Sequence, residues 1–332
     1  MHLGLSFKYL LCSIASWHIQ GPKKNILLKA TARGGSTWVM EMIASQPGFR
    51  FYDEPFNIRR DNVKKAGLFC SWEELQPDTC DNEKVIKFLE ALKYNQYRFM
   101  SPAPFRKYYR PVTRRIVFKL HELEHLIKEI SERCDCDVLY LMRHPIPNSL
   151  SRAVVPRLDS FLASDFYRER YLGERKMNEI INVARKGTRL QRFVVSWCFE
   201  NYIPLKEVSL DGNKWTALSY EELLLNSRKS CRYLSESLGL EDQDRLLRSV
   251  GEPSTNISMS GQETMEIMEN PDDKDRKKNL VTRWKKRVSD EAERDAMEVL
   301  LLFDIDAYKY GRFIPNAKLL RFDDTAEKLN TE

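Results

Sequence analysis

Apolar residues occur along the chain in short runs, and each run is followed by a stretch in which apolar residues recur at helical spacing. Asn25 to Ala30 is the first run, bounded by Pro22 and Gly34, and it predicts a buried strand. Three further runs predict strands at Arg115 to Leu120, Asp137 to Met142 and Trp215 to Ser219. Runs without alternating polar positions are typical of strands in a parallel sheet that is covered on both faces.

Helical patterns follow these strands. A first helix is predicted from Trp38 to Ser45, and Pro47 ends it. The segment "ELEHLIKEI" predicts a second helix with one apolar face, made of Leu123, Leu126, Ile127 and Ile130. After the third strand two prolines keep the turn open, and a helix is predicted to start near Asn148. The fourth strand precedes one long helix, "YEELLLNSRKSCRYLSESLGL". This alternation predicts an α/β fold with a mostly parallel central sheet, helices on both faces and ligands at the carboxyl ends of the strands.

No internal repeat or linker divides the chain, so a single domain is predicted for residues 25–315. Two insertions interrupt the alternation. The first, near 56–112, is polar and aromatic, and the second, near 157–195, is helical and rich in arginine; both are expected to cap a substrate cleft. Residues 251–279 have little periodicity and predict a mobile loop, and residues 316–332 form a C-terminal tail.

Residues 1–24 allow two interpretations. Five apolar residues recur at helical spacing, which predicts an amphipathic helix packed on the core: Leu3, Phe7, Leu10, Ile14 and Trp17. The run contains Lys8 and is shorter than the roughly 20 residues of a spanning helix. The alternative is a weak anchor that associates with a membrane. The helix is favoured, and with it a cytoplasmic location; the alternative places the protein in the Golgi lumen.

Composition narrows the class of partner. The chain has 332 residues, of which 42% are hydrophobic and 31% charged, as in soluble globular proteins. Its formal net charge of +6 suits an anionic small molecule, and no motif of a nucleic-acid-binding module is present, so no nucleic-acid partner is expected. The seven cysteines are scattered without paired C-x-x-C motifs, so a zinc site is not predicted.

The stretch "ILLKATARGGSTWVMEMI" combines a strand, a glycine turn and the start of a helix. Such a turn points backbone N–H groups at one position, and the helix dipole favours an anion there. Thr31, Ser36 and Thr37 can donate hydroxyl hydrogen bonds, and Arg33 adds a positive charge. A nucleoside triphosphatase loop has lysine immediately before the serine, but Gly35 stands at that place. The pattern therefore predicts an anion-binding loop that is not built for ATP.

The segment "TARGGSTW" resembles the 5′-phosphosulfate loop of sulfotransferases, which use 3′-phosphoadenosine 5′-phosphosulfate (PAPS). The resemblance implies a P-loop-like three-layer sandwich. It also implies that Arg33 contacts the 5′-phosphosulfate, that Trp38 stacks on adenine, and that the phosphosulfate is cradled by Gly34, Gly35, Ser36 and Thr37. Gly34 departs from the family pattern, which usually has serine there.

A second segment, "VLYLMRHPIPNSLSRAV", resembles the 3′-phosphate element of the same family. Arg143 leaves a strand and Ser151 follows eight positions later, so the two side chains can hold one phosphate together. His144 replaces the usual aspartate or asparagine, which puts a turn-capping role at this position in doubt. Weaker resemblances place Tyr220 near the adenine and the segment Arg283, Trp284 and Lys285 near the 3′-phosphate.

Two residues are candidates for the general base. His121 lies in "FKLHEL", where Lys119-x-His121 resembles the K-x-H of cytosolic sulfotransferases, and imidazole titrates near neutral pH. Glu54 lies in "YDEP", which resembles a segment of carbohydrate sulfotransferases. His121 is slightly favoured and both are kept. Lys119 and Arg33 are expected to stabilise charge that develops on the leaving group.

The sequence therefore predicts a sulfotransferase that moves a sulfuryl group from PAPS to an acceptor hydroxyl and releases the 3′,5′-bisphosphate product, PAP. The acceptor is a carbohydrate or a small alcohol or lipid, and no metal is expected. Two alternatives stay open: an ATP-dependent kinase with a P-loop-like fold, and a nucleotide-binding protein without catalysis. The sequence does not indicate the oligomeric state.

Overall fold

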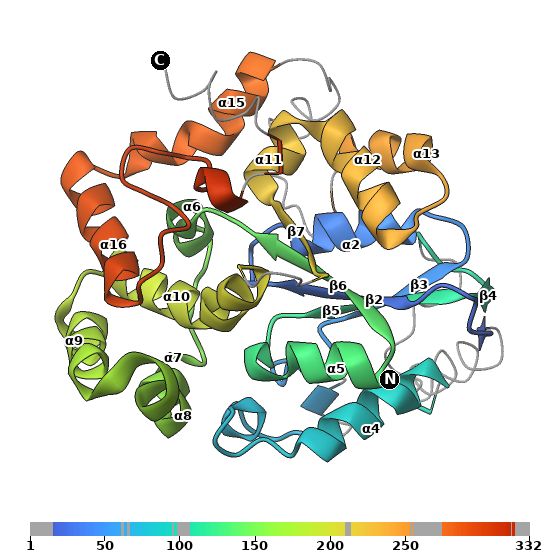
Figure 1. Cartoon of the computed structure of the whole chain (residues 1–332), viewed down its shortest axis with the longest axis horizontal. Helices are drawn as coiled ribbons and strands as arrows, with labels where there is room; N and C mark the ends of the chain where they lie inside the picture. Colours follow the sequence, from blue (N-terminus) through green and yellow to red (C-terminus); the bar gives the residue numbers. More distant parts are fainter. Residues whose placement is uncertain are drawn as a thin grey trace, which may run out of the picture.

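A five-stranded parallel sheet in the order β3-β5-β2-β6-β7 forms the centre of the computed structural model (Figure 1). The structure describes residues 16–60, 63–64, 67–94, 96–97, 107–209, 214–252, 254, 274–319 and 321–322. Four strands confirm the predicted ones: β2 (Asn25–Ala30), β5 (Arg115–Leu120), β6 (Cys136–Met142) and β7 (Thr216–Ser219). The sheet is thus the mostly parallel sheet that the apolar runs predict.

The central strand β2 separates two hydrophobic cores. Each of its residues is buried, and Leu28 pairs with Lys119 on one side and with Leu139 on the other. Ile26 and Leu28 face one core and Leu27 faces the other, because successive side chains of a strand point to opposite faces. A strand covered on both faces is rich in apolar residues, which explains the run from Ile26 to Leu28, and the buried Lys29 beside this run is paired with Glu124.

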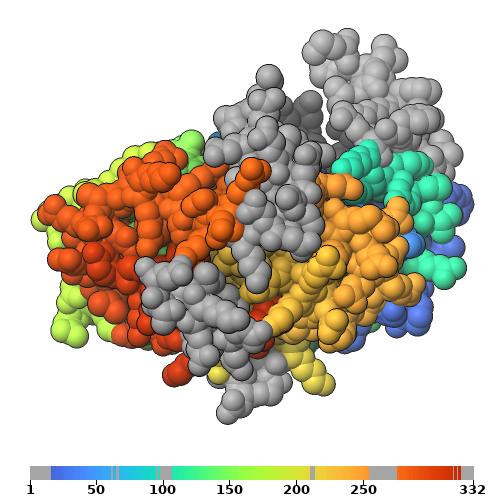
Figure 2. Space-filling view, turned by 90° about the horizontal axis from the view of Figure 1, so that it is seen from above, coloured from blue at the N-terminus to red at the C-terminus, as the bar shows by residue number. Residues whose placement is uncertain are grey.

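Helices cover both faces of the sheet (Figure 1). One face carries α2 (Ser36–Ala44), α11 (Tyr220–Leu225), α12 (Ser227–Leu238) and α13 (Gln243–Val250). The other face carries α4 (Asn82–Lys93), η3 (Glu124–Leu126) and α5 (Ile127–Arg133). Seen from above, α12 and α13 and the orange segment formed by α15 (Lys274–Thr282), η6 (Arg283–Arg287) and α16 (Asp290–Leu302) make up much of the surface (Figure 2). The prediction of helices on both faces is confirmed.

The insertion near 157–195 is helical, as predicted, and packs beside the sheet. It comprises α7 (Leu158–Leu162), α8 (Asp165–Tyr167), the π-helical turn η4 (Arg168–Leu172), α9 (Gly173–Lys186) and the start of α10 (Arg189–Val208). The insertion near 56–112 contributes η1 (Glu73–Leu75), α4 and the short strand β4 (Val112–Thr113). The tail contains the 3-10 turn η7 (Ala317–Leu319). No helix in the described part of the chain is long and apolar enough to cross a membrane.

The fifth strand, β3 (Phe49–Asp53), was not predicted. Arg50 interrupts its apolar pattern, yet this side chain is buried, donates to the carbonyl of Lys93 at 2.6 Å and lies over the ring of Tyr52. Arg50 is therefore stabilised in the strand by a contact with α4, a helix that is distant from β3 in the sequence.

One predicted helix boundary was wrong for a local reason. The helix after β6, α6 (Pro145–Leu150), starts before Asn148, because Nδ1 of His144 accepts a hydrogen bond from the N–H of Ile146 at 3.3 Å and caps it. Pro145 then takes the first helical position, which its fixed φ favours. His144 thus performs the capping role that its departure from the family pattern put in doubt.

The helix predicted from Trp38 to Ser45 is present as α2, but two other predicted helices are shorter or broken. Leu123 has a φ of 62°, so the helix predicted from "ELEHLIKEI" begins with a turn, although its four apolar residues are buried as predicted. The long helix after β7 breaks at Asn226 into α11 and α12.

The amphipathic helix predicted within residues 1–24 does not extend to Trp17. Trp17 lies in the strand β1 (Trp17–His18), which pairs with β4, and its side chain is 66% exposed. The other residues of the proposed stripe lie outside the described residues, as does most of the loop predicted for 251–279.

Candidate functional site

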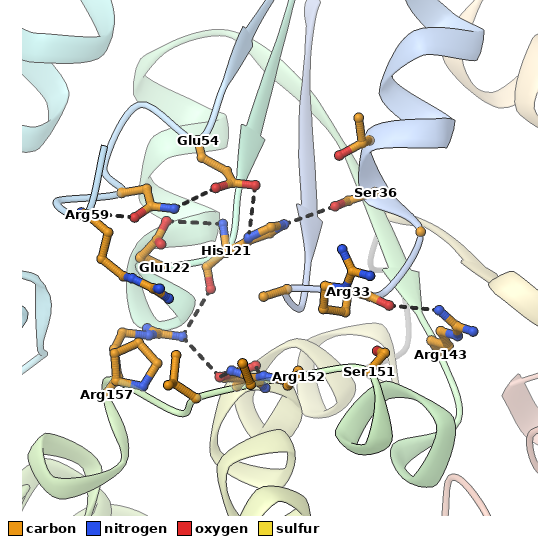
Figure 3. A pocket seen from close by; sticks show the side chains of 18 of the residues that line it. Arg33, Ser36, Glu54, Arg59, His121, Glu122, Arg143, Ser151, Arg152 and Arg157 are labelled. Carbon is orange, nitrogen blue, oxygen red and sulfur yellow. Dashed lines mark hydrogen bonds and ion pairs between the residues drawn. The ribbon is translucent and has the colours of Figure 1, made fainter. Parts of the chain in front are cut away.

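A cavity of about 640 Å³ lies where the loops that follow β2, β3, β5 and β6 meet (Figure 3). Carboxyl ends of parallel strands share one edge of a sheet, so side chains far apart in the sequence come together there. The predicted site residues that line the cavity are Arg33, Gly35, Ser36, Thr37, Trp38, Glu54, His121, Arg143, Ser151, Tyr220 and Arg283. Most of the predicted site residues therefore surround a single cavity.

The loop between β2 and α2 is held in a tight turn. The N–H of Gly34 donates to the carbonyl of Thr31 at 3.0 Å, and a Cβ at Gly34 would lie 2.9 Å from that oxygen. The side-chain amide of Asn148 donates to the hydroxyl of Thr31 and to the carbonyl of Ala32, both at 3.0 Å. The glycine that departs from the family pattern thus fits a turn with no room for a side chain. Asn148, which the sequence did not single out, ties the loop to α6.

Gly35 precedes α2 and adopts a φ of 91°, which favours glycine. A Cβ here would lie 2.6 Å from the ring of Tyr220. The first intrahelical bond runs from the N–H of Val39 to the carbonyl of Gly35 at 3.2 Å, and no side chain caps the helix. The N–H groups of the first turn of α2 therefore face the cavity, together with the positive end of the helix dipole.

Arg143 links the two predicted phosphate-binding elements. Its Nη1 donates to the carbonyl of Arg33 at 2.8 Å, and its guanidinium carbon lies 4.3 Å from the ring centroid of Tyr220. The buried Nε of Arg143 has no hydrogen-bond partner among the described residues. Ser151 ends α6 and donates its hydroxyl to the carbonyl of Asn148 at 2.7 Å. Arginine and serine therefore lie beside the loop, as their spacing of eight predicts.

Trp38 is buried in the wall of the cavity. Its ring packs edge-to-face on Tyr220 with 5.7 Å between centroids, and its Nε1 has no hydrogen-bond partner in the described part of the chain. The two aromatic residues that the resemblance places near an adenine are thus in contact with each other.

Only the first residue of the segment from Arg283 to Lys285 lines the cavity. Trp284 is buried and stacks on His144 with 4.8 Å between ring centroids. Lys285 donates to the carbonyl of Gly311 at 2.9 Å. Trp284 thus anchors the segment to α6 while Arg283 faces the cavity.

The two candidate bases lie side by side. Nδ1 of His121 lies 3.4 Å from Oε1 of Glu54, and Nε2 of His121 lies 2.9 Å from the hydroxyl of Ser36 (Figure 3). Burial lowers the pKa of His121 to about 3; Glu54 opposes this shift, and Lys119 and Lys29 add to it. The imidazole is therefore neutral at neutral pH, with a proton on Nδ1 that faces the carboxylate and a lone pair on Nε2.

Glu54 is ionised by its neighbours. It follows β3 in a left-handed conformation with a φ of 53° and accepts from the amide of Asn57 at 2.6 Å. Its carboxylate lies 2.9 Å from Nζ of Lys119 and 3.3 Å from Arg60. Burial opposes ionisation, but the charges of His121, Lys119 and Arg60 together with the Asn57 hydrogen bond hold the pKa of Glu54 well below its usual range.

Lys119 connects this pair to the loop. Its side chain is fully buried, and Nζ donates to the hydroxyl of Thr37 at 3.0 Å while it also contacts Asp53 and Glu54. The cation therefore lies beneath the start of α2, next to the position that an anion would occupy.

Other residues line the cavity that the sequence did not single out: Asn57, Arg59, Trp72, Glu122, Arg152, Arg157 and Glu200. Asn57, Arg59 and Trp72 belong to the first insertion and Arg157 begins the second, so both insertions contribute residues to the wall of the cavity. Burial raises the pKa of Glu122 to about 7. In the sequence, only the position of Asn57 and Arg59 just after "YDEP" indicates that these two residues could lie at the site. Among the described residues no group of three or more His, Cys, Asp or Glu side chains is placed to hold a metal ion.

Residues 23–301 match the family model of the sulfotransferase domain. Among solved structures, the sulfotransferase domain of the Synechococcus PCC 7002 olefin synthase is 17% identical, with a TM-score of 0.42, and the match covers 88% of this chain and 99% of that one. The sulfotransferase domain from the curacin biosynthetic pathway is 14% identical, with a TM-score of 0.45 and coverage of 86% and 99%. Mouse sulfotransferase SULT7A1 complexed with PAP is 15% identical, with a TM-score of 0.37 and coverage of 90% and 93%. No curated protein matches the chain in sequence.

Proposed function

The chain belongs to the sulfotransferase domain family, and we propose that it transfers a sulfuryl group from PAPS to an acceptor hydroxyl and releases PAP. One observation carries this proposal. The hydrogen bond from Arg143 to the carbonyl of Arg33 joins two anion-binding elements at a cavity that also contains His121. A nucleotide with a phosphate at each end of its ribose requires two such elements, and sulfuryl transfer requires a base beside them.

The cavity fits such a donor. The N-terminal end of α2 has no side-chain cap, so the N–H groups of its first turn are available to an anion. Nε of Arg143 and Nε1 of Trp38 are buried donors without a partner among the described residues. A buried donor without a hydrogen-bond partner is unfavourable unless a ligand pairs with it. Nε of Arg143 therefore supports a bound anion, and Nε1 of Trp38 supports an adjacent nucleotide base.

The predicted residues that line the cavity would make the contacts with the donor, whereas Trp284 and Lys285 contact other parts of the chain. The first turn of α2 and Arg33 would hold the 5′-phosphosulfate, with Lys119 beneath them. Arg143, Ser151 and Arg283 would hold the 3′-phosphate, and Trp38 and Tyr220 would border the adenine. PAPS supplies a sulfuryl group bonded to its 5′-phosphate.

His121 is the proposed general base, and Glu54 is its partner rather than its competitor. Nε2 accepts the proton of the acceptor hydroxyl, while Nδ1–H is held by the carboxylate of Glu54, which stabilises the imidazolium that forms. The hydroxyl of Ser36 contacts Nε2 in the structure, so an acceptor hydroxyl replaces it there. The new S–O bond forms at the acceptor oxygen as the bond to the 5′-phosphate oxygen breaks, and Lys119, Arg33 and the N–H groups of the loop stabilise the charge left on that oxygen.

The remaining wall supports a hydroxylated acceptor. Asn57, Arg59, Trp72 and Glu122 line the cavity on the side of Glu54 and offer an amide, a cation, one aromatic ring and a carboxyl group. A sugar can stack on an aromatic face and bond to the polar groups, whereas an apolar lipid would leave those groups unpaired. We therefore favour a carbohydrate acceptor over a lipid.

Calorimetry with PAP in the absence of metal tests the donor site. The wild type is expected to bind PAP, and Arg143→Ala to bind it about 10- to 100-fold more weakly, because hydrogen bonds to charged groups contribute about 1.5–3 kcal/mol. Arg294→Ala, which removes an arginine stacked on Tyr310 away from the cavity, is the matched control. Binding of ATP with Mg²⁺ in place of PAP would favour the kinase. Tight PAP binding without transfer of labelled sulfate to any hydroxyl would favour the non-catalytic alternative.

A further inference from the structure

Five charged side chains are buried together behind His121, between the end of β2, the turn after β5 and α10. They are Lys29, Glu124, Arg152, Arg157 and Glu200, and each is at most 6% exposed. Burial of an unpaired charge is strongly unfavourable, so such a group persists only where each charge has partners.

Ion pairs connect all five charges, and Nη2 of Arg157 joins the two halves of the group because it lies 3.9 Å from Oε1 of Glu200. Arg152 forms two hydrogen bonds with Glu200, at 2.9 and 2.7 Å. Glu124 is shared by two cations: Nζ of Lys29 lies 3.0 Å from it, and Arg157 binds it through two nitrogens at 3.0 and 2.6 Å. Burial opposes ionisation of Glu124, but Arg157 and Lys29 hold its pKa well below the usual range. Glu124 therefore has two cationic partners, one of which, Arg157, also lies near Glu200.

Both cations that bind Glu124 also donate to one backbone atom. Nζ of Lys29 donates to the carbonyl of His121 at 2.7 Å. Nη2 of Arg157 donates to the same oxygen at 3.1 Å (Figure 3). One donor comes from the central strand and the other from the start of the second insertion. A carbonyl with two charge-assisted hydrogen bonds from two separate elements has little freedom to rotate.

This carbonyl belongs to the turn that carries the proposed base. The N–H of His121 donates to the carboxyl group of Glu122 at 3.2 Å, and Leu123 completes the turn in a left-handed conformation. With both backbone groups of His121 fixed, the direction of its Cα–Cβ bond is fixed as well. The ring then lies between Ser36 and Glu54.

We propose that Lys29 and Arg157 are positioning residues for His121, which hold its carbonyl and thereby direct its imidazole into the cavity. Arg157 also lines the cavity, but both of its terminal nitrogens already bind Glu124, so it positions the base instead of binding substrate. The role of the ring as a base rests on the proposed function, whereas the geometry that holds it does not.

Imidazole NMR of the full chain tests this proposal without donor or acceptor. The chain has five histidines, so the spectrum is simple, and His121→Asn identifies the signals of His121. In the wild type a single neutral tautomer with the proton on Nδ1 is expected. The test variants are Lys29→Met and Arg157→Gln; each leaves Glu124 one cationic partner, so both are expected to fold.

In both variants the ring of His121 is expected to lose its single tautomer. In Lys29→Met its pKa is also expected to rise by about one unit, because the charge of Lys29 lowers it in the wild type. The charged groups around the ring stay in place in that variant: Asp53, Glu54, Arg60, Lys119, Glu122, Glu124 and Arg157. Lys277→Met removes another buried lysine, which donates to Ser227 at 3.0 Å, and should leave His121 unchanged.

Folded Lys29→Met and Arg157→Gln proteins with the tautomer and pKa of the wild type would overturn the proposal. Calorimetry with PAP on the same proteins keeps the two questions separate. If the wild type does not bind PAP, the proposed donor is refuted, but the proposal about the geometry of the His121 ring is not affected. Unchanged PAP affinity in the variants, together with transfer slowed about a hundredfold, is the expected signature of a misdirected base.

Discussion

Oε1 of Glu54 lies 3.4 Å from Nδ1 of His121, and the same oxygen lies 2.9 Å from Nζ of Lys119. A carboxylate that is already ionised by a buried lysine does not itself take up a proton near neutral pH. It instead fixes the tautomer of the adjacent imidazole and stabilises the positive charge that forms on it. This relationship assigns one role to each residue of the pair.

The first prediction follows from this pair. His121→Asn is expected to slow transfer of labelled sulfate from PAPS by a factor of about 10² to 10⁴, since that is the usual contribution of a general base. Glu54→Gln is expected to slow it about 10²-fold, because Glu54 raises the pKa of His121 and its loss makes the imidazole a weaker base.

The double variant tests whether His121 and Glu54 act together or independently. His121→Asn with Glu54→Gln should be no slower than His121→Asn alone, because groups that act together give non-additive losses. Calorimetry with PAP confirms that the donor site is intact. If the rate losses of the two single variants multiply in the double variant, Glu54 acts independently of His121.

The second prediction distinguishes neighbours in one basic segment. Arg283 lines the cavity, whereas Lys285 donates to the carbonyl of Gly311. Arg283→Ala is expected to weaken PAP binding about tenfold or more, and Lys285→Ala to change it less than about twofold. The two variants remove equal charge, so equal losses of affinity would show that the segment attracts the donor only through its net charge.

The sequence predicts the centre of this fold better than its edge. The inner strands contain runs of adjacent apolar residues because both of their faces are covered, and this pattern is visible without any tertiary information. β3 escapes the same analysis because the partners of Arg50 are the carbonyl of Lys93 and the ring of Tyr52, and the first of these is brought close only by folding. A strand whose polar residue is stabilised by a remote element has no local signature.

The candidate site shows the same limit. Local spacing predicts that Arg143 and Ser151 lie close together, because the strand and the helix turn that carry them are adjacent in the sequence, and both line the cavity. The contact between Glu54 and His121 joins the ends of two different strands, and no spacing encodes it. Sequence reasoning therefore found both residues but treated them as competitors.

The third prediction concerns the turn before α2. Gly35→Ala combines an unfavourable φ with overlap against Tyr220, and it is expected to weaken PAP binding at least tenfold and to destabilise the fold by about 1–3 kcal/mol. Gly311→Ala is the matched control: its φ is 79°, but no atom lies within 4 Å of the added Cβ. It is expected to cost about 1 kcal/mol in urea unfolding and to leave PAP binding unchanged. PAP affinity that survives in Gly35→Ala would contradict the proposed cradle.

The fourth prediction concerns pH and a buried carboxyl group beside Arg143. Glu221 accepts hydrogen bonds from the N–H of His144 and from the hydroxyl of Tyr308, both at 3.0 Å. Burial raises the pKa of Glu221 from its ordinary value of 4.5 to about 7. Between these two pH values the folded state binds more protons than the unfolded state, so the contribution of this group to stability is lost as the pH rises through 7.

Glu221→Gln cannot ionise, so it should remove this loss. Its amide oxygen can accept from the N–H of His144, and its NH2 group can donate to the hydroxyl of Tyr308, which is also an acceptor. The variant is expected to gain stability over the wild type as the pH rises from about 5 to about 8, by up to about 3 kcal/mol, since one pKa unit corresponds to about 1.4 kcal/mol. Urea unfolding of both proteins at several pH values measures the difference. Burial also lowers the pKa of His121 and of His144 to about 3, and these groups make stability rise with pH over the acidic part of the range. The stability of the wild type alone therefore combines opposite effects. The difference in unfolding free energy between the two proteins isolates the effect of Glu221. A gap between the two proteins that does not change with pH would show that Glu221 is ionised in the folded state, in which case its charge would oppose a 3′-phosphate at Arg143.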